Sequence, residues 1–129
     1  MTIATPQDVS ARIFIDPSAK KLFSDLTSAV NGVTAATGST QATGVRIENA
    51  ITRVTTVGTA GDSLTLPKAQ AGMQCVVINA AAANSMDVFH AAGDAINALA
   101  ADAALAVAAN KTVLLVCAVP GTWNAIVTA

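Results

Sequence analysis

The chain has 129 residues and a formal net charge of −1; charged residues make up 12% of it and hydrophobic residues 53%. This length suffices for one ordinary domain with its own core and is too short for two full domains. Lys and Arg are not clustered, so the chain lacks the electrostatic footprint of a nucleic-acid-binding protein, and we expect no nucleic-acid partner.

Neither a membrane nor a secretory route is indicated. No apolar run approaches the roughly 18 to 20 residues that a membrane span requires. The first residues also lack the basic flank and apolar stretch of a signal peptide. We therefore expect no membrane partner and synthesis in a cytoplasm.

The supply of large core-forming side chains is small. The chain has three Phe, one Trp and no Tyr, and much of its apolar fraction is alanine, which buries little area per residue. Net stability is a small difference between large opposing terms. We therefore expect additional surface to be buried between identical copies or against a larger assembly.

Residues 1–44 have the pattern of an N-terminal arm. An Asp-Pro start signal is followed by apolar residues at helical spacing: Asp16, Pro17, Leu22, Phe23, Leu26 and Val30. This predicts a helix over about 17–31, which the pair Asn31-Gly32 would end. Residues 33–44 include no large side chain and are predicted to form a linker. We place the domain boundary after residue 44, so that 45–129 forms a β-domain.

Beyond residue 44, short β-branched or apolar runs alternate with turn residues. The runs predict strands at 45–48, 51–57, 63–66, 73–79, 86–89, 95–97, 105–107, 112–118 and 122–128. Two of them, 73–79 and 112–118, are almost continuously apolar, which is typical of strands buried on both faces. Residues 98–109 are ambiguous, because their alanines favour a helix whereas their neighbours favour a strand. Short strands with turns every 8–12 residues predict a compact antiparallel β-sandwich or small barrel.

Five short motifs follow one another between residues 63 and 127: Leu64-Thr65-Leu66-Pro67, Val76-Val77-Ile78-Asn79, Gly93-Asp94-Ala95-Ile96-Asn97, Asn110-Lys111-Thr112 and Gly121-Thr122-Trp123. Their order and spacing resemble a module of tailed-bacteriophage virion proteins. Two positions depart from that module: His90 stands where it usually has proline, and Ala98-Leu99 replace a glycine-rich step.

The resemblance implies a non-enzymatic virion structural protein. A small chain of this kind looks most like a capsid decoration, or cement, protein that binds the major capsid protein on the outer head surface and stabilises the shell as a homotrimer. One alternative is a tail or head-fibre component that carries the same module. Another is a carbohydrate-binding β-sandwich, which would need exposed aromatic side chains that this chain scarcely has.

Large apolar residues in an arm without its own core must dock on another surface. Our interface candidates are therefore Ile13, Phe14, Leu22, Phe23 and Leu26, within a segment 1–32 that we expect to contact a sister subunit or the capsid. Trp123 follows a Pro-Gly turn, and no second aromatic lies near it in sequence to form a sugar-binding shelf. We expect it to be a core or interface anchor.

The residues that could perform chemistry are few and separated. His90, Asp87 and Asp94 could supply metal ligands, but strand alternation places Asp87 and His90 on opposite faces. We expect a surface histidine beside a turn in which Asp94 binds backbone amides. Cys117 has apolar neighbours and no adjacent base. The sequence thus predicts no catalytic residue, no metal and no cofactor, and it predicts that Cys75 and Cys117 are free and buried rather than paired.

Overall fold

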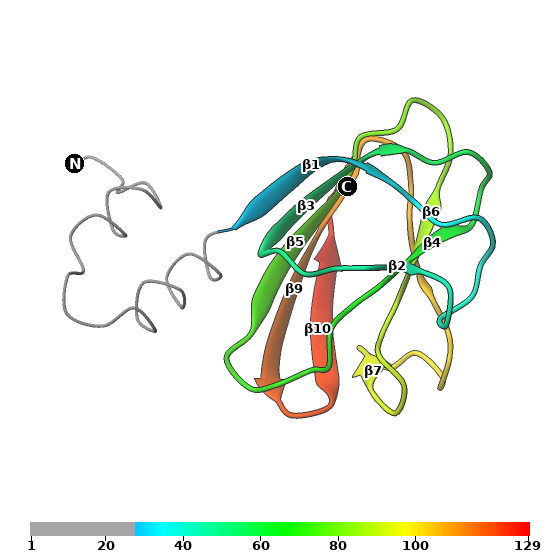
Figure 1. The fold of residues 1–129 in the computed structure, drawn as a ribbon. Helices are drawn as coiled ribbons and strands as arrows, with labels where there is room; N and C mark the ends of the chain where they lie inside the picture. The colour runs from blue at the N-terminus through cyan, green and yellow to red at the C-terminus, as the bar shows by residue number, and fades with distance from the viewer. Residues whose placement is uncertain (1–27) are drawn as a thin grey trace, which may run out of the picture.

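The computed structural model describes residues 28–129, which form ten strands in two sheets and contain no helix (Figure 1). In the larger sheet the strand order is β1 (Ala29–Thr34), β3 (Ile51–Thr56), β5 (Gln74–Asn79), β9 (Lys111–Val119), β10 (Thr122–Val127) and β7 (Ala95–Ile96). In the smaller sheet it is β2 (Val45–Arg46), β4 (Asp62–Thr65), β6 (Met86–Phe89) and β8 (Leu105–Val107).

The first six strands wind as a coil. They alternate between the two sheets, so that β1, β3 and β5 pair in parallel in the larger sheet while β2, β4 and β6 pair in parallel in the smaller one. Parallel neighbours need a crossover connection, and here the crossover is a strand of the opposite sheet. The arrangement is β-solenoid-like.

The protein is therefore mainly β, as predicted, but the expected antiparallel sandwich or barrel is wrong. Apolar alternation and turn spacing predict where a strand lies, and both look the same at a hairpin and at the corner of a coil. Among the named strands, the antiparallel pairs are β9 with β5, β9 with β10, and β8 with β6. The ambiguous stretch 98–109 contains a strand, β8, as its neighbours indicated.

The start of the described chain differs from the prediction. Residues 29–31, expected to end a helix, lie in β1. Ala35 N then donates to Thr56 O of β3 in the larger sheet, and Ala36 forms a bridge with Ser63 of β4 in the smaller sheet. Gly32 has φ +82° within an irregular stretch of the β1–β3 pairing. It serves a bulge rather than a helix end, because pairing with β3 overrides a weak local helix preference. The rest of the expected helix lies outside the described residues.

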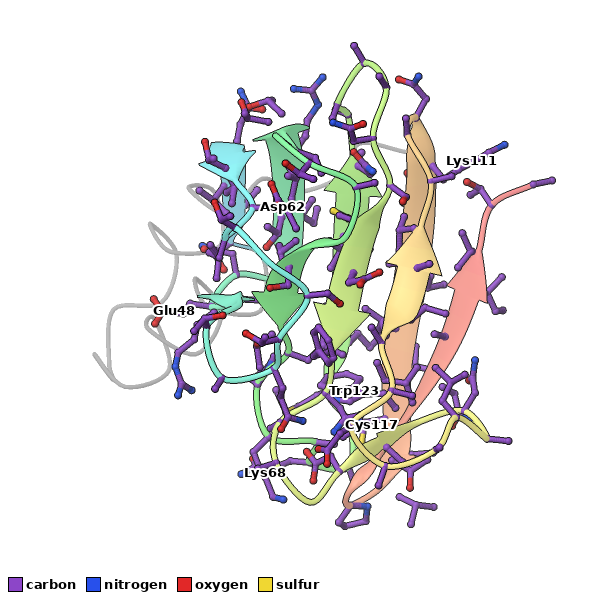
Figure 2. All side chains as sticks on the ribbon, turned by 90° about the vertical axis from the view of Figure 1, so that its right-hand side faces the viewer. Glu48, Asp62, Lys68, Lys111, Cys117 and Trp123 are labelled. Carbon is purple, nitrogen blue, oxygen red and sulfur yellow. The ribbon has the colours of Figure 1, made fainter. Side chains whose placement is uncertain are left out.

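The core lies between the two sheets. Its largest fully buried side chains include Trp123, Leu64, Leu66, Met86, Ile96 and Leu115. Figure 2 shows Trp123 and Cys117 inside the molecule, while the side chain of Lys111 extends away from it. Both cysteines are free and buried, as predicted, and burial raises the pKa of Cys75 to about 12. No helix among the described residues could span a membrane.

Candidate functional site: the outer face of the six-stranded sheet

Five apolar residues stand side by side across the larger sheet: Ala29, Ile51, Val76, Leu114 and Ile126. Directly paired residues point to the same face of a sheet, so this apolar row lies on the face turned away from the smaller sheet. Ile51 is 40% exposed, Leu114 is 44% exposed and Ile126 is 71% exposed. No residue of 28–129 covers the row.

Polar residues flank the apolar row along the strands. On one side Arg53 lies opposite Asn31, and its Nη1 donates to Asn31 Oδ1 at 2.9 Å. On the other side Gln74 and Asn124 both lie opposite Val116. The flanking rows also contain the apolar residues Ile78 and Val116, so the rim is only partly polar. An apolar centre with polar residues at its rim is typical of a protein–protein interface.

The sequence of β5 and β9 is suited to burial on both faces, yet only one face is buried. β5 is a central strand, as predicted, between β3 and β9. The inward residues Val77, Val113 and Leu115 are fully buried, whereas Leu114 and Val116 on the outer face are exposed. Exposed apolar surface of this kind commonly marks a binding site. The prediction that β5 and β9 are buried on both faces is therefore wrong for residues 28–129. The apolar residues that remain exposed on their outer face form the candidate interface.

The residues of the phage-like motifs serve the fold. Asn79 is fully buried, and its Nδ2 donates to the carbonyl oxygens of Asn84 and Val107, each at 2.9 Å. Asn97 Oδ1 accepts a hydrogen bond from Ala125 N at 2.8 Å. These side chains fasten one segment of backbone to another, and they form no catalytic arrangement.

Asp94 joins the turn before β7 to the segment 68–69 that follows β4. It accepts hydrogen bonds from Ala69 N at 2.7 Å and from Lys68 Nζ at 2.6 Å. Asp94 therefore binds one backbone amide, and this amide belongs to a segment 25 residues away rather than, as predicted, to its own turn. Desolvation acts to raise the pKa of Asp94, but the hydrogen bonds from Lys68 and Ala69 and the charges of Lys68 and His90 outweigh it, and the pKa is lowered.

His90 is buried at 1% exposure, so the prediction of a surface histidine is wrong. Gln41 Nε2 donates to His90 O at 2.7 Å, and the loop that carries Gln41 covers His90. Gln41 is 49 residues away in the chain, so the residues around His90 do not indicate that it is covered. Asp87 instead contacts Ser39. Within residues 28–129 no group of three His, Cys, Asp or Glu side chains is placed to hold a metal ion.

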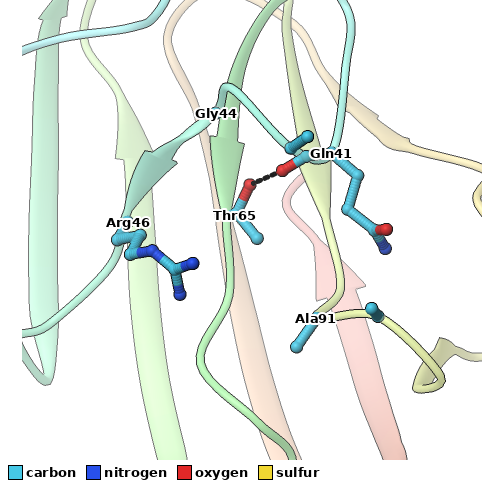
Figure 3. A pocket seen from close by; sticks show the side chains of 7 residues that line it. Gln41, Gly44, Arg46, Thr65 and Ala91 are labelled. Atoms are coloured by element: carbon cyan, nitrogen blue, oxygen red, sulfur yellow. Dashed lines mark hydrogen bonds between the residues drawn. The ribbon is translucent and has the colours of Figure 1, made fainter.

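A hollow of about 190 Å³ lies beside this loop, between Gln41, Gly44, Arg46, Thr65 and Ala91 (Figure 3). Thr65 Oγ1 donates to Gln41 O at 2.7 Å across its wall. Arg46 is the one charged side chain that lines the hollow, and the lining contains no acid or histidine. The hollow is therefore a weaker candidate than the apolar row.

The interface residues proposed from the sequence, Ile13, Phe14, Leu22, Phe23 and Leu26, lie outside the described residues. Trp123 is fully buried, and its Nε1 donates to Pro67 O at 3.4 Å. Sequence reasoning missed the apolar row, although the continuous apolar runs of β5 and β9 contained the signal for it.

No family model, curated protein or solved structure matches this chain. The functional assignment therefore depends on the residues of the chain itself. Among these, the apolar row contains three of the six large hydrophobic residues that are exposed within 28–129, namely Ile51, Leu114 and Ile126.

Proposed function

We propose that this protein is a non-enzymatic structural component of a tailed-phage virion, and that it decorates the outer surface of the capsid by binding the major capsid protein. The observation that carries the proposal is the exposed apolar row with its polar rim. A rigid sheet that presents such a face is suited to assembly with other proteins.

The phage-like motifs support the virion class. The motif residues Asn79, Asp94, Asn97 and Trp123 are used for hydrogen bonds and core packing within the fold. Because these residues stabilise the fold, the resemblance that they carry concerns the fold rather than a binding surface. The surfaces around the scaffold are then free to serve assembly, which is the role of a decoration protein.

A decoration protein binds a repetitive shell and commonly does so as a symmetric oligomer. Icosahedral shells offer threefold and quasi-threefold positions, and a trimer of this chain would match them. The alternative of a tail or head-fibre component uses the same module in another part of the virion. A carbohydrate-binding role is less well supported, because the two aromatic residues within 28–129, Phe89 and Trp123, are both buried.

The proposal is tested with phage particles that lack this protein. The purified chain is added at increasing concentration, and the amount that sediments with the particles is measured. We expect saturable binding to heads, with a copy number that is a multiple of three. Binding to isolated tails instead of heads would assign the fibre role, and no binding to either would overturn the proposal.

A further inference from the structure

We propose that Asn31 is a site of spontaneous deamidation, in which its side-chain amide is converted to a carboxylate with release of ammonia. The resulting carboxylate forms an ion pair with Arg53 beside the apolar row. The inference is independent of the proposed function, because it concerns the chemistry of one dipeptide and of one neighbouring side chain in the sheet.

The residue that follows Asn31 favours the reaction. Asn31 is the one asparagine of the chain that a glycine follows. In deamidation the backbone nitrogen of the next residue attacks the side-chain carbonyl carbon, and a side chain on that next residue hinders the approach. Gly32 has no side chain, and a Cβ atom built at its position would meet no atom within 4 Å. Both residues are exposed, so water reaches the reacting groups.

The pairing of β1 with β3 is irregular at Gly32. Asn31 stands opposite Arg53 and Val33 stands opposite Val54, so Gly32 has no register partner in β3. Its φ of +82° is one that glycine adopts without strain. The extra residue of a bulge is left unpaired, and β1 is the edge strand of the larger sheet. The backbone at Gly32 can therefore adjust as the new bond forms.

Arg53 lies where it can assist the attack. Its Nη1 donates to Asn31 Oδ1 at 2.9 Å. Negative charge develops on this oxygen as the backbone nitrogen attacks Cγ, and a donor that already points at the oxygen stabilises the transition state. The same guanidinium favours the product, because it forms a charge-assisted hydrogen bond with the new carboxylate.

The reaction balances with water as its co-reactant. The Gly32 nitrogen gives its proton to a base from the solvent and bonds to Cγ of Asn31. The bond between Cγ and Nδ2 breaks, and the amide group takes a proton from the solvent and leaves as ammonia. The five-membered cyclic imide then takes up one water molecule. Opening at Cγ yields aspartate, and opening at the backbone carbonyl carbon of Asn31 yields isoaspartate, in which the main chain runs through the side chain.

Deamidation changes the charge beside the apolar row. Arg53 with a neutral Asn31 carries a single positive charge, whereas Arg53 with a carboxylate carries none. An isoaspartate also lengthens the main chain of β1, at a point where the pairing is already irregular. A partner that contacts this part of the rim therefore meets a different charge on aged protein than on newly made protein.

The first experiment incubates the full-length native protein for several weeks at mildly alkaline pH. Peptide mass spectrometry measures the fraction of each asparagine that is converted to an acid, and chromatography separates the isoaspartate peptide. We expect conversion of Asn31 and none of Asn124, the matched control, which is exposed in β10 and precedes Ala125. An Asn31 that stays intact in the native protein would overturn the proposal, whether or not the denatured chain is converted there.

The second experiment tests the part assigned to Arg53. This side chain is exposed, so Arg53→Gln should leave the circular dichroism spectrum unchanged, and we expect conversion of Asn31 to be several-fold slower than in the wild type. Arg53→Lys keeps the positive charge and should restore part of the rate. Conversion in Arg53→Gln at the wild-type rate or faster would overturn the assistance by Arg53, and with it this account of the site.

Discussion

Leu114 and Ile126 stand directly opposite each other across the β9–β10 pair, with both side chains exposed on the outer face of the sheet. Their neighbours in the next register position, Leu115 and Ala125, point inward, and Leu115 is fully buried. Fully burying a side chain such as Leu or Ile stabilises by about 1.5 to 3 kcal/mol relative to exposure. A partner that covers this pair would therefore gain substantial binding energy.

The first prediction concerns thermal unfolding. If the apolar row is covered by other copies, the wild-type Tm should rise with protein concentration, because association stabilises the folded state by mass action. Ile126→Ser removes apolar area only from the contact, so its Tm should be lower at high concentration and independent of concentration. Calorimetry over a hundredfold range of concentration checks this. A wild-type Tm that does not change over that range would contradict it.

The second prediction concerns Asn79. Replacing it by alanine leaves the carbonyl oxygens of Asn84 and Val107 and the amide of Ala81 without their present partner. Losing partners for buried polar groups costs about 1 to 3 kcal/mol, so Asn79→Ala should lower the free energy of unfolding by about that amount. Asn124→Ala, an exposed control, should change it by less than about 0.5 kcal/mol. Denaturant titration of both variants decides, and equal effects would count against the structural role of Asn79.

The third prediction concerns Thr52. This residue is 2% exposed, and its Oγ1 finds no hydrogen-bond partner among the described residues. Thr52→Val keeps the shape and removes the unsatisfied hydroxyl, so it should stabilise the protein by about 1 kcal/mol. Thr52→Ser keeps the hydroxyl, removes the methyl group and should destabilise. If chemical denaturation shows Thr52→Val to be clearly less stable than wild type, the hydroxyl has a partner after all.

The fourth prediction concerns acid. Asp62 has a lowered pKa because it accepts hydrogen bonds from the backbone of Thr59, Gly38 and Gly58, which outweigh desolvation, and the pKa of Asp94 is also lowered. A carboxyl group whose pKa is lower in the folded state adds stability above its unfolded value of 3.8. That stability is lost as the pH falls through the folded pKa. We expect Tm to drop below about pH 4.

The matched variant for the acid experiment is Asp94→Asn. It cannot ionise, so its Tm should be lower than wild type at pH 7 and should fall less steeply between pH 5 and pH 2.5. Thermal melts across this range, scored by circular dichroism, test the expectation. An identical pH dependence in the two proteins would show that Asp94 contributes no linked protonation.

The fifth prediction concerns the N-terminal segment. Because β1 begins at Ala29 and pairs with β3, deletion of residues 1–27 should leave the sheets folded, whereas deletion of residues 1–34 also removes β1. Phe23→Ala should lower occupancy on phage heads without changing the fold, if the segment is a docking arm. Particle binding and circular dichroism of the variant test this together, and unchanged occupancy would contradict the arm hypothesis.

Much of the strand pattern could be predicted from the sequence, because β-branched runs and their bounding glycines are local signals. The direction of pairing was not predictable, since the corner between β3 and β4 resembles a hairpin turn in sequence. β1 was missed because residues 29–34 gain their strand structure from β3, which is distant in sequence. The burial of His90 was missed for the same reason, since the covering residue, Gln41, lies far away in the chain.

The candidate site shows the same difference between features that local sequence predicts and features that depend on residues distant in the chain. Inward residues such as Val77 and Leu115 could be predicted from apolar continuity, and the structure buries them. The continuous apolar runs of β5 and β9 indicated two members of the apolar row, Val76 and Leu114, but the whole row could not be predicted because it depends on the register of five strands. Once the register is known, Ile51, Leu114 and Ile126 are seen to form one surface.

Cryo-electron microscopy of the virion that contains this protein tests the central claim most directly. The account predicts density for three copies of the two-sheet fold at threefold or quasi-threefold positions on the outer capsid surface. Capsids without such density, in particles whose tails or fibres hold the protein or in which it is missing, would contradict the account.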